Sequence, residues 1–221
     1  NHKFFIPPLS LTPTAVTDYI EITYDASGHA QIFNRWASDI IIDTPSETRT
    51  LSSASGTGFA VTAGDIVTIT ESIPDTTFRS WSTTSVGNGT FTGVAGRITK
   101  IPPIHRFTTD ESGTTAGNNF FKFFNHMGSI TSLPEGSFDL SSITSTGYGF
   151  CHGFNRGGKL TSLPVGSFNT NNIVNAGASF FSQFGADADG PLTTLPVNSF
   201  KFNNLIQVGN DAFSHFNYSA D

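Results

Sequence analysis

Charged residues are scarce in this chain. Asp, Glu, Lys and Arg make up 13% of its 221 residues, against about 25% in ordinary soluble domains. The formal net charge of −6 leaves no basic footprint of the kind that nucleic-acid-binding or anionic-lipid-binding proteins carry. Ser, Thr and Asn must therefore supply most of the polar surface, a composition typical of secreted surface proteins.

Cysteine and methionine are almost missing, with one residue of each. The single cysteine, Cys151, cannot form an intramolecular disulfide and excludes a clustered-cysteine metal site. No apolar run approaches the ~20 residues of a membrane-spanning helix, so we expect no membrane insertion. The sequence begins at Asn1 rather than Met, which we interpret as the removal of a secretory signal segment. The expected location is therefore extracellular or on the cell surface.

One unit occurs four times in the C-terminal part of the chain. The copies span 98–129, 130–159, 160–191 and 192–221, a period within the range of stacked repeat proteins. A unit this short cannot bury its apolar face alone, so neighbouring copies must stack to form a core. We therefore predict a solenoid over 98–221.

The copies share a pattern of apolar and turn residues. Each opens with two apolar residues three positions apart and then Pro, which lacks the N–H that a strand ladder needs, so a short strand must end there. In the second half, apolar residues at i, i+1 and i+4 predict one or two turns of helix. Equivalent phenylalanines are expected to point inward: Phe107, Phe138, Phe168 and Phe200, then Phe124, Phe154, Phe184 and Phe216.

The segments ITSLPEGSFDLSSI and LTSLPVGSFNTNNI resemble the BspA-like leucine-rich repeats of bacterial surface proteins. In that family a strand alternates with a short Phe-containing helix. The copies here are longer than the usual family unit and carry Pro after the strand. The resemblance covers 98–221 only, and it implies a curved parallel solenoid with an extracellular adhesive role and no catalytic residues.

Residues 1–97 show no helical periodicity and read as short strands between turns. The expected strands are 17–24, 29–33, 39–42, 58–61, 65–70 and 77–81. Strands at this spacing predict an antiparallel β-sandwich-like module, with Trp36 and Trp81 as core residues. Strands in 77–94 are expected to cap the first copy, because a solenoid end exposes its apolar layer. The predicted fold class is thus mixed β and α/β: a β-sandwich-like module followed by a leucine-rich-repeat-like solenoid of four units.

Catalytic chemistry has little support in the sequence. No nucleophile elbow, phosphate-binding loop or zinc motif is present, and the six His residues share no repeat column. Cys151, beside His152, falls in a column of Phe, where it serves as a small apolar residue. Asp187 and Asp189 resemble half of a calcium loop without its closing acidic residue, which we interpret as an exposed turn. We therefore expect no enzyme activity, no metal and no cofactor.

The fourth copy is followed by no polar cap, so its apolar layer and strand edge are expected to be exposed. Three explanations are open: a longer repeat array, completion by another subunit, or a self-sufficient last copy. The second predicts a structural or adhesive protein that binds itself head-to-tail and forms open filaments or closed rings. The candidate assembly residues are Phe200, Leu205, Phe213, Phe216 and Tyr218.

The alternative is a monomeric binding module. Thr131, Thr161 and Thr193 alternate with the inward residues of the predicted strands and should therefore face outward. A hydroxyl-lined stripe of this kind would recognise another surface protein or a host glycan.

Overall fold

The computed structural model describes residues 18–79, 90–109, 112–186, 192–197 and 199–218. In these residues the chain consists of β-strands and turns, and its one helical element is a 3₁₀ turn, η1 (Ile104–Arg106). The β-rich character expected from the sequence is confirmed. The short helices predicted for the second half of each copy are wrong.

The N-terminal part contains two β-sheets. One has six strands in the order β10-β8-β1-β6-β3-β4, and the other has three in the order β5-β2-β7. All pairs among β1 to β8 are antiparallel, consistent with the predicted sandwich. The strands are β1 (Tyr19–Tyr24), β2 (Gly28–Phe33), β3 (Ile40–Asp43), β4 (Thr48–Leu51), β5 (Gly56–Val61), β6 (Ile66–Glu71), β7 (Phe91–Gly93), β8 (Gly96–Lys100) and β10 (Ile130–Ser132).

Alternation of apolar and polar residues places these strands. Along β1 every second residue is buried, among them Ile20 and Ile22, as a period of two requires. Five of the six predicted strands are found as β1, β2, β3, β5 and β6. The sixth is wrong, because Thr77–Arg79 form turns, and its remaining residues, including Trp81, lie outside the described part. Trp36 is fully buried, as predicted, and packs on Phe78 with ring centroids 5.4 Å apart.

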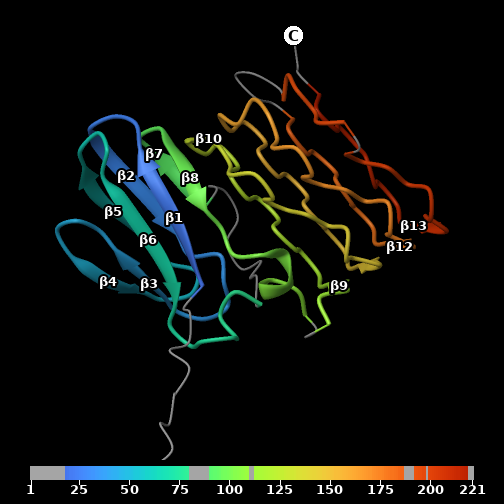
Figure 1. Cartoon of the computed structure of the whole chain (residues 1–221), viewed down its shortest axis with the longest axis horizontal. Helices are drawn as coiled ribbons and strands as arrows, with labels where there is room; N and C mark the ends of the chain where they lie inside the picture. The colour runs from blue at the N-terminus through green and yellow to red at the C-terminus, as the bar shows by residue number, and fades with distance from the viewer. Residues whose placement is uncertain (1–17, 80–89, 110–111, 187–191, 198, 219–221) are drawn as a thin grey trace, which may run out of the picture.

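Beyond β8 the chain forms coils that stack beside the sandwich (Figure 1). Four short strands form a parallel ladder in the order β13-β12-β11-β9, and they are β9 (Thr115–Ala116), β11 (Ser145–Thr146), β12 (Asn175–Ala176) and β13 (Gln207–Val208). Paired strands come from successive copies, so neighbouring copies lie on one another. The ladder lies in the second half of each copy. At the apolar opening, where we predicted the strand, β8 reaches Lys100 in the first copy and β10 lies in the second, and the two pair in parallel. The described part of the third and fourth copies has one bridge there, Ser162–Thr194.

The aromatic half of each copy is a turn ribbon, the name used here for 119–127, 149–157, 179–186 and 211–217. In the first copy alternate residues from Asn119 to Met127 have positive φ. Between them, the N–H groups of Lys122 and Phe124 donate to carbonyls three residues back, at 3.0 and 3.1 Å. An α-helix needs negative φ at every residue, and this alternation therefore excludes the predicted helix.

Phenylalanine rings fill the interior of the coils in columns. Phe124, Phe154, Phe184 and Phe216 stack in parallel with centroid separations of 5.1, 4.9 and 5.3 Å. Neighbouring columns meet edge-to-face, a preferred aromatic geometry, as in Phe154–Phe168 at 5.1 Å. The inward orientation predicted for these columns is confirmed.

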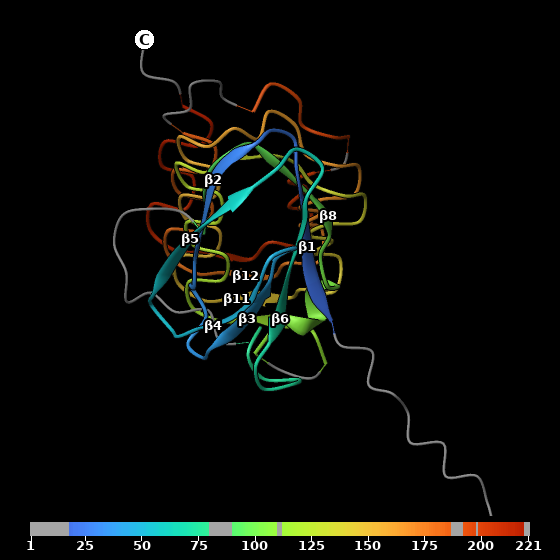
Figure 2. The same ribbon diagram turned by 90° about the vertical axis from the view of Figure 1, so that its left-hand side faces the viewer.

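The sandwich covers the first coil, and the coils lie behind it in Figure 2. β8 pairs with β1 on one side and with β10 on the other, so one sheet continues from the sandwich into the second copy. Phe91 of β7 packs edge-to-face on Phe124 at 5.5 Å. Arg106 ties η1 to the sandwich through Glu71 at 2.6 Å and Asp75 at 2.8 Å. β7, from the segment 77–94 that was predicted to cap the first copy, thus contacts that copy.

Candidate functional site

The fourth copy presents an apolar end face, which we define as the side chains of Phe200, Phe202, Leu205, Phe213 and Phe216 together with the backbone edge of 211–216. The equivalent rings of the third copy, such as Phe168, Phe181 and Phe184, are completely buried. In the fourth copy Phe213 is 40% exposed, and the other four side chains are half-buried. The change arises because each ring of the third copy has a coil on both sides, whereas the described structure places none beyond the fourth.

The backbone edge of the end face has unused hydrogen-bonding groups. In the third copy, the N–H groups of Ser179 and Gln183 donate to carbonyls of the next coil, at 2.8 and 2.7 Å. The equivalent N–H groups, those of Asp211 and His215, have no acceptor in the described part of the chain.

Carbonyl groups along the same edge also lack the hydrogen bonds that their equivalents accept in earlier copies. The carbonyls of Phe150 and Phe184 accept from the following coil at 3.0 and 2.6 Å. Those of Ala212 and Phe216, which hold the same places in the fourth copy, accept no hydrogen bond from any described residue. Unpaired backbone groups beside apolar side chains are the hallmark of a surface that pairs with another chain.

An asparagine ladder runs up the inside of the turn ribbons. Asn125 and Asn155 each bond through both side-chain ends to the backbone five residues on, and Asn125 donates to Asn155 Oδ1 at 2.7 Å. Gly185 interrupts the ladder, and Asn217 of the next coil instead donates to the Leu192 carbonyl at 3.0 Å. The Oδ1 atom of Asn217 is buried without a partner among the described residues, which adds an unsatisfied acceptor near the end face.

Four of the five predicted assembly residues, Phe200, Leu205, Phe213 and Phe216, belong to the end face. The fifth, Tyr218, is 51% exposed and packs edge-to-face on His215 at 5.7 Å. The sequence reasoning missed Phe202, which lies 5.3 Å from Phe213. Its equivalents are Leu140 and Thr170, so no Phe column marks the position.

The three candidate ligand-face threonines have different surroundings. Thr161 and Thr193 are exposed, and the Thr193 hydroxyl donates to the Thr161 carbonyl at 3.1 Å. Thr131 is half-buried, and its hydroxyl donates to the Gly96 carbonyl of β8 at 3.2 Å. The exposed hydroxyl stripe is thus confined to the third and fourth copies.

The Cys151–His152 pair is poorly suited to nucleophilic chemistry. Cys151 is fully buried, and burial raises the pKa of its thiol well above the usual value, so the reactive thiolate is disfavoured. Burial, with help from Lys122, Arg156 and His126, lowers the pKa of His152 to about 4. The thiol and the imidazole therefore both stay neutral at pH 7.

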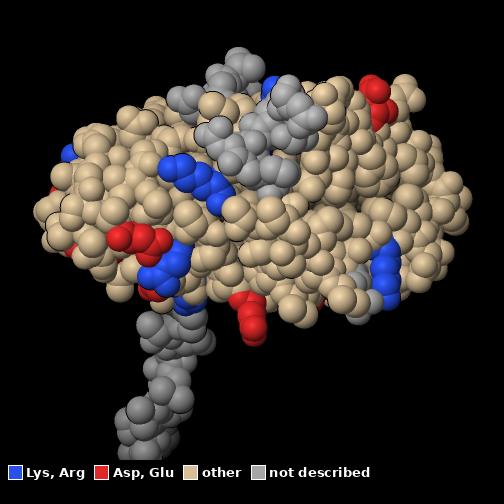
Figure 3. Space-filling model, turned by 90° about the horizontal axis from the view of Figure 1, so that it is seen from above, with Lys and Arg blue, Asp and Glu red and all other residues tan. Residues whose placement is uncertain are grey.

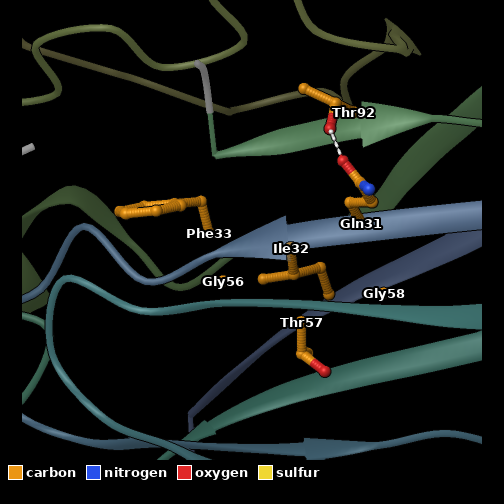
Figure 4. A pocket seen from close by; sticks show the side chains of 7 residues that line it. All are labelled: Gln31, Ile32, Phe33, Gly56, Thr57, Gly58 and Thr92. Atoms are coloured by element: carbon orange, nitrogen blue, oxygen red, sulfur yellow. Dashed lines mark hydrogen bonds between the residues drawn. The ribbon is translucent and has the colours of Figure 1, made fainter. Parts of the chain in front are cut away.

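The described residues offer few groups that could hold a metal ion or a small molecule. Within the described residues no group of three or more His, Cys, Asp or Glu side chains could hold a metal ion, and Asp187 and Asp189 lie outside those residues. A cavity of about 170 Å³ lies against β2, β5 and β7, where the Thr92 hydroxyl donates to Gln31 Oε1 at 3.1 Å (Figure 4). Its lining contains no titratable side chain, and it is smaller than the ~300 Å³ of ordinary ligand pockets. Two larger hollows, of about 450 and 340 Å³, lie on either side of Pro103, and the first is lined by His105 and Asp139.

The face of the molecule seen in Figure 3 carries isolated ionic groups on a largely uncharged background. No described helix has the length and apolar character needed to cross a membrane. Comparison with family models, curated proteins and solved structures found no match to this chain.

Proposed function

We propose that this chain is a non-enzymatic structural or adhesive protein of the cell exterior that self-associates through its end face. The observation that supports the proposal is the contrast between the two ends of the coil stack. At the first copy the apolar layer is covered by the sandwich, whereas at the fourth it is exposed. Burial of apolar surface contributes about 25 cal/mol per Å², so covering the end face is favourable.

The partner in this proposal is a second copy of the chain. The head-to-tail geometry expected from the sequence would seat the end face of one protomer on the sandwich of the next, and such heterologous contacts generate filaments unless the rotation closes a ring. The four copies in this proposal constitute a leucine-rich-repeat-like solenoid of the BspA-like type, with the turn ribbon in place of the family's short helix. The parallel ladder and the stacked Phe columns support that assignment.

Export to the cell surface belongs to the same proposal. It rests on the low charge of the chain and on the resemblance of 130–143 and 160–173 to bacterial surface repeats. The direct check is to fractionate the native source and to ask whether the protein is recovered from the surface or the medium.

A second function, recognition of a host protein or glycan, is favoured by the exposure of Thr161 and Thr193. In that case the coil stack would present hydroxyl groups at successive levels of a regular surface. Replacing either Thr by Lys should then leave folding intact and reduce adhesion to the bound surface.

Sedimentation velocity across micromolar concentrations tests self-association. The wild-type chain should sediment faster as concentration rises, and Phe213→Asp should remain monomeric because it places a charge in the end face. Val165→Asp is the matched control, since Val165 is 75% exposed in the third copy and lies outside the end face. A strictly monomeric wild-type protein would remove the assembly proposal and leave the hydroxyl stripe as the candidate.

A further inference from the structure

The N–H groups of Ala212 and Phe213 have no acceptor among the described residues. Four further backbone groups of the same ribbon lack the hydrogen bond that their counterparts in earlier copies make to a following coil: the Asp211 N–H, the Ala212 carbonyl, the His215 N–H and the Phe216 carbonyl. All four face the side on which a further coil would stack, because their equivalents in earlier copies bond in that direction, as the Gln183 N–H does to the Ser214 carbonyl at 2.7 Å. The order is donor, acceptor, donor, acceptor.

This order is complementary to itself when the second ribbon runs in the opposite direction. A twofold axis between residues 213 and 214 places the Asp211 N–H of one chain opposite the Phe216 carbonyl of the other chain. It also places the His215 N–H opposite the Ala212 carbonyl of that chain. Each pair occurs twice by symmetry, so four hydrogen bonds form and all eight groups are used. An isologous contact requires this self-complementarity, and an antiparallel β-ladder achieves it in the same way.

The rest of the end face fits the same axis. The axis reverses the direction in which the coils stack and the direction in which the ribbon runs. It therefore leaves the apolar interior of one chain opposite the apolar interior of the other chain. Phe213, the most exposed ring of the end face, lies next to the axis and meets the matching region of its counterpart. Burial of the phenylalanine columns and pairing of the backbone edge thus occur in one contact.

The sandwich is a poor partner for the end face by comparison. Its described residues expose two large apolar side chains, Ile66 and Ile73. Its outer edge strands are β4 and β5, and β4 carries Arg49, which is paired with Glu47 at 2.5 Å. Arg49 also donates to Thr57 Oγ1 of β5 at 2.7 Å and to the Gly58 carbonyl at 3.2 Å. Charge on an edge strand opposes pairing with another chain.

The first coil is equally closed to a second copy. The Ser129 N–H donates to the Phe91 carbonyl at 3.0 Å, the Gly96 N–H donates to the Ser129 carbonyl at 3.2 Å, and Phe91 packs on Phe124. The end face therefore finds no equivalent open coil at the opposite end of the molecule.

We infer that two chains join end face to end face as an antiparallel, twofold-symmetric dimer in which the turn ribbons of the fourth copies pair. The inference rests on the proposed function, because it specifies which surface of the second copy the end face binds. It differs from head-to-tail assembly in its outcome. An isologous contact uses the same patch on both protomers and closes at two, whereas head-to-tail contact continues.

Site-directed crosslinking of the full chain distinguishes the two geometries. Ser214→Cys places a thiol beside the predicted axis, and Thr50→Cys places one on the exposed edge strand β4. The native Cys151 is fully buried and does not compete for reagent. The two variants are mixed in equal amounts, treated with a short bismaleimide, and the linked peptides are identified by mass, while sedimentation of the unmodified chain gives the largest species.

The dimer predicts links between residue 214 of one chain and residue 214 of the other, with no species larger than two chains. Links between 214 and 50, with species that grow with concentration, would overturn the dimer while leaving self-association standing. A chain that stays monomeric at every concentration would overturn both. Crosslinking in Phe213→Asp, Ser214→Cys supplies the control, since loss of the end face should abolish the 214–214 link.

Discussion

The two ends of the coil stack are built from the same repeated unit and end in opposite ways. At the first copy, β7 of the sandwich packs on Phe124 and accepts a backbone hydrogen bond from Ser129, and β8, which runs into this copy, pairs with β1 of the sandwich. At the fourth copy, rings that are buried elsewhere are half-buried or exposed, and four backbone groups of the turn ribbon lack the hydrogen bond that their counterparts make to a following coil. Each coil presents the same apolar rings and backbone groups to the coil that follows, so a repeated coil can continue to stack. It can therefore be stopped only by residues that do not repeat, which the sandwich supplies at one end.

The largest expected effect separates interior from terminal rings. Phe184→Ala should lower the free energy of unfolding by about 3–5 kcal/mol through lost burial and a cavity, because Phe184 is fully buried between Phe154 and Phe216. Phe216→Ala should cost roughly half as much, since Phe216 is only half-buried. Phe138, Phe154 and Phe168 should behave like Phe184 in urea unfolding at concentrations too low for association. Equal losses of unfolding free energy in Phe184→Ala and Phe216→Ala would mean that Phe216 is as well packed as a ring with a coil on both sides.

The junction at the capped end should be nearly as sensitive. Arg106→Ala leaves Glu71, whose side chain is 2% exposed, as a buried charge without its cation, and we expect a loss of about 3 kcal/mol. Arg97→Ala, which removes an exposed pair with Asp25 at 2.7 Å, should cost less than about 1 kcal/mol. Chemical denaturation of both variants measures the difference. Similar small losses would indicate that Arg106 does not hold the cap.

The asparagine ladder provides a third contrast. Asn155→Ala breaks bonds to both the N–H and the carbonyl of Leu160 and the bond from Asn125, and should cost about 2–3 kcal/mol because buried groups lose their partners. Asn217 makes one side-chain bond, to the Leu192 carbonyl, so Asn217→Ala should cost about 1 kcal/mol. Thermal unfolding of the two variants tests the order, and a reversed order would contradict it.

The smallest expected effect is a pH dependence. The pKa of His152 is lowered from 6.5 to about 4 in the folded chain, so between these pH values the unfolded state binds more protons. Stability should therefore rise with pH through this window and fall as pH is lowered towards 4. The residue is only partly buried, and solvent screening keeps the effect modest. His152→Gln should flatten the slope of stability against pH, and an unaltered slope in this variant would exclude His152 as its source.

The parts of the fold that could be predicted are those whose structure is determined by a local sequence pattern. Alternation identified β1, and repetition identified the columns of Phe154 and Phe184. The turn ribbon could not be predicted, because Phe, Met and Gln at positive φ are disfavoured locally and are tolerated here only where backbone bonds to neighbouring coils compensate. The apolar residues whose spacing suggested a helix, Phe120, Phe121 and Phe124 in the first copy, are buried in that ribbon although φ alternates in sign along it.

The end face was only partly predictable for the same reason. Phe200, Phe213 and Phe216 follow from the repeat columns, whereas Phe202 occupies a column of unlike residues. The unused groups of Asp211 and His215 belong to the backbone, and no side-chain pattern marks them. They emerge only when the hydrogen bonds of one coil are compared with those of the next.

Hydrogen exchange at single amides, followed as a function of protein concentration, tests the central claim most directly. The amides of Ser179 and Gln183 bond to the following coil and should be protected at every concentration. If the end face associates, the amides of Asp211 and His215 should exchange fast in dilute solution and gain protection as concentration rises. Fast exchange of Asp211 and His215 at all concentrations, with Ser179 and Gln183 protected throughout, would contradict association through the end face.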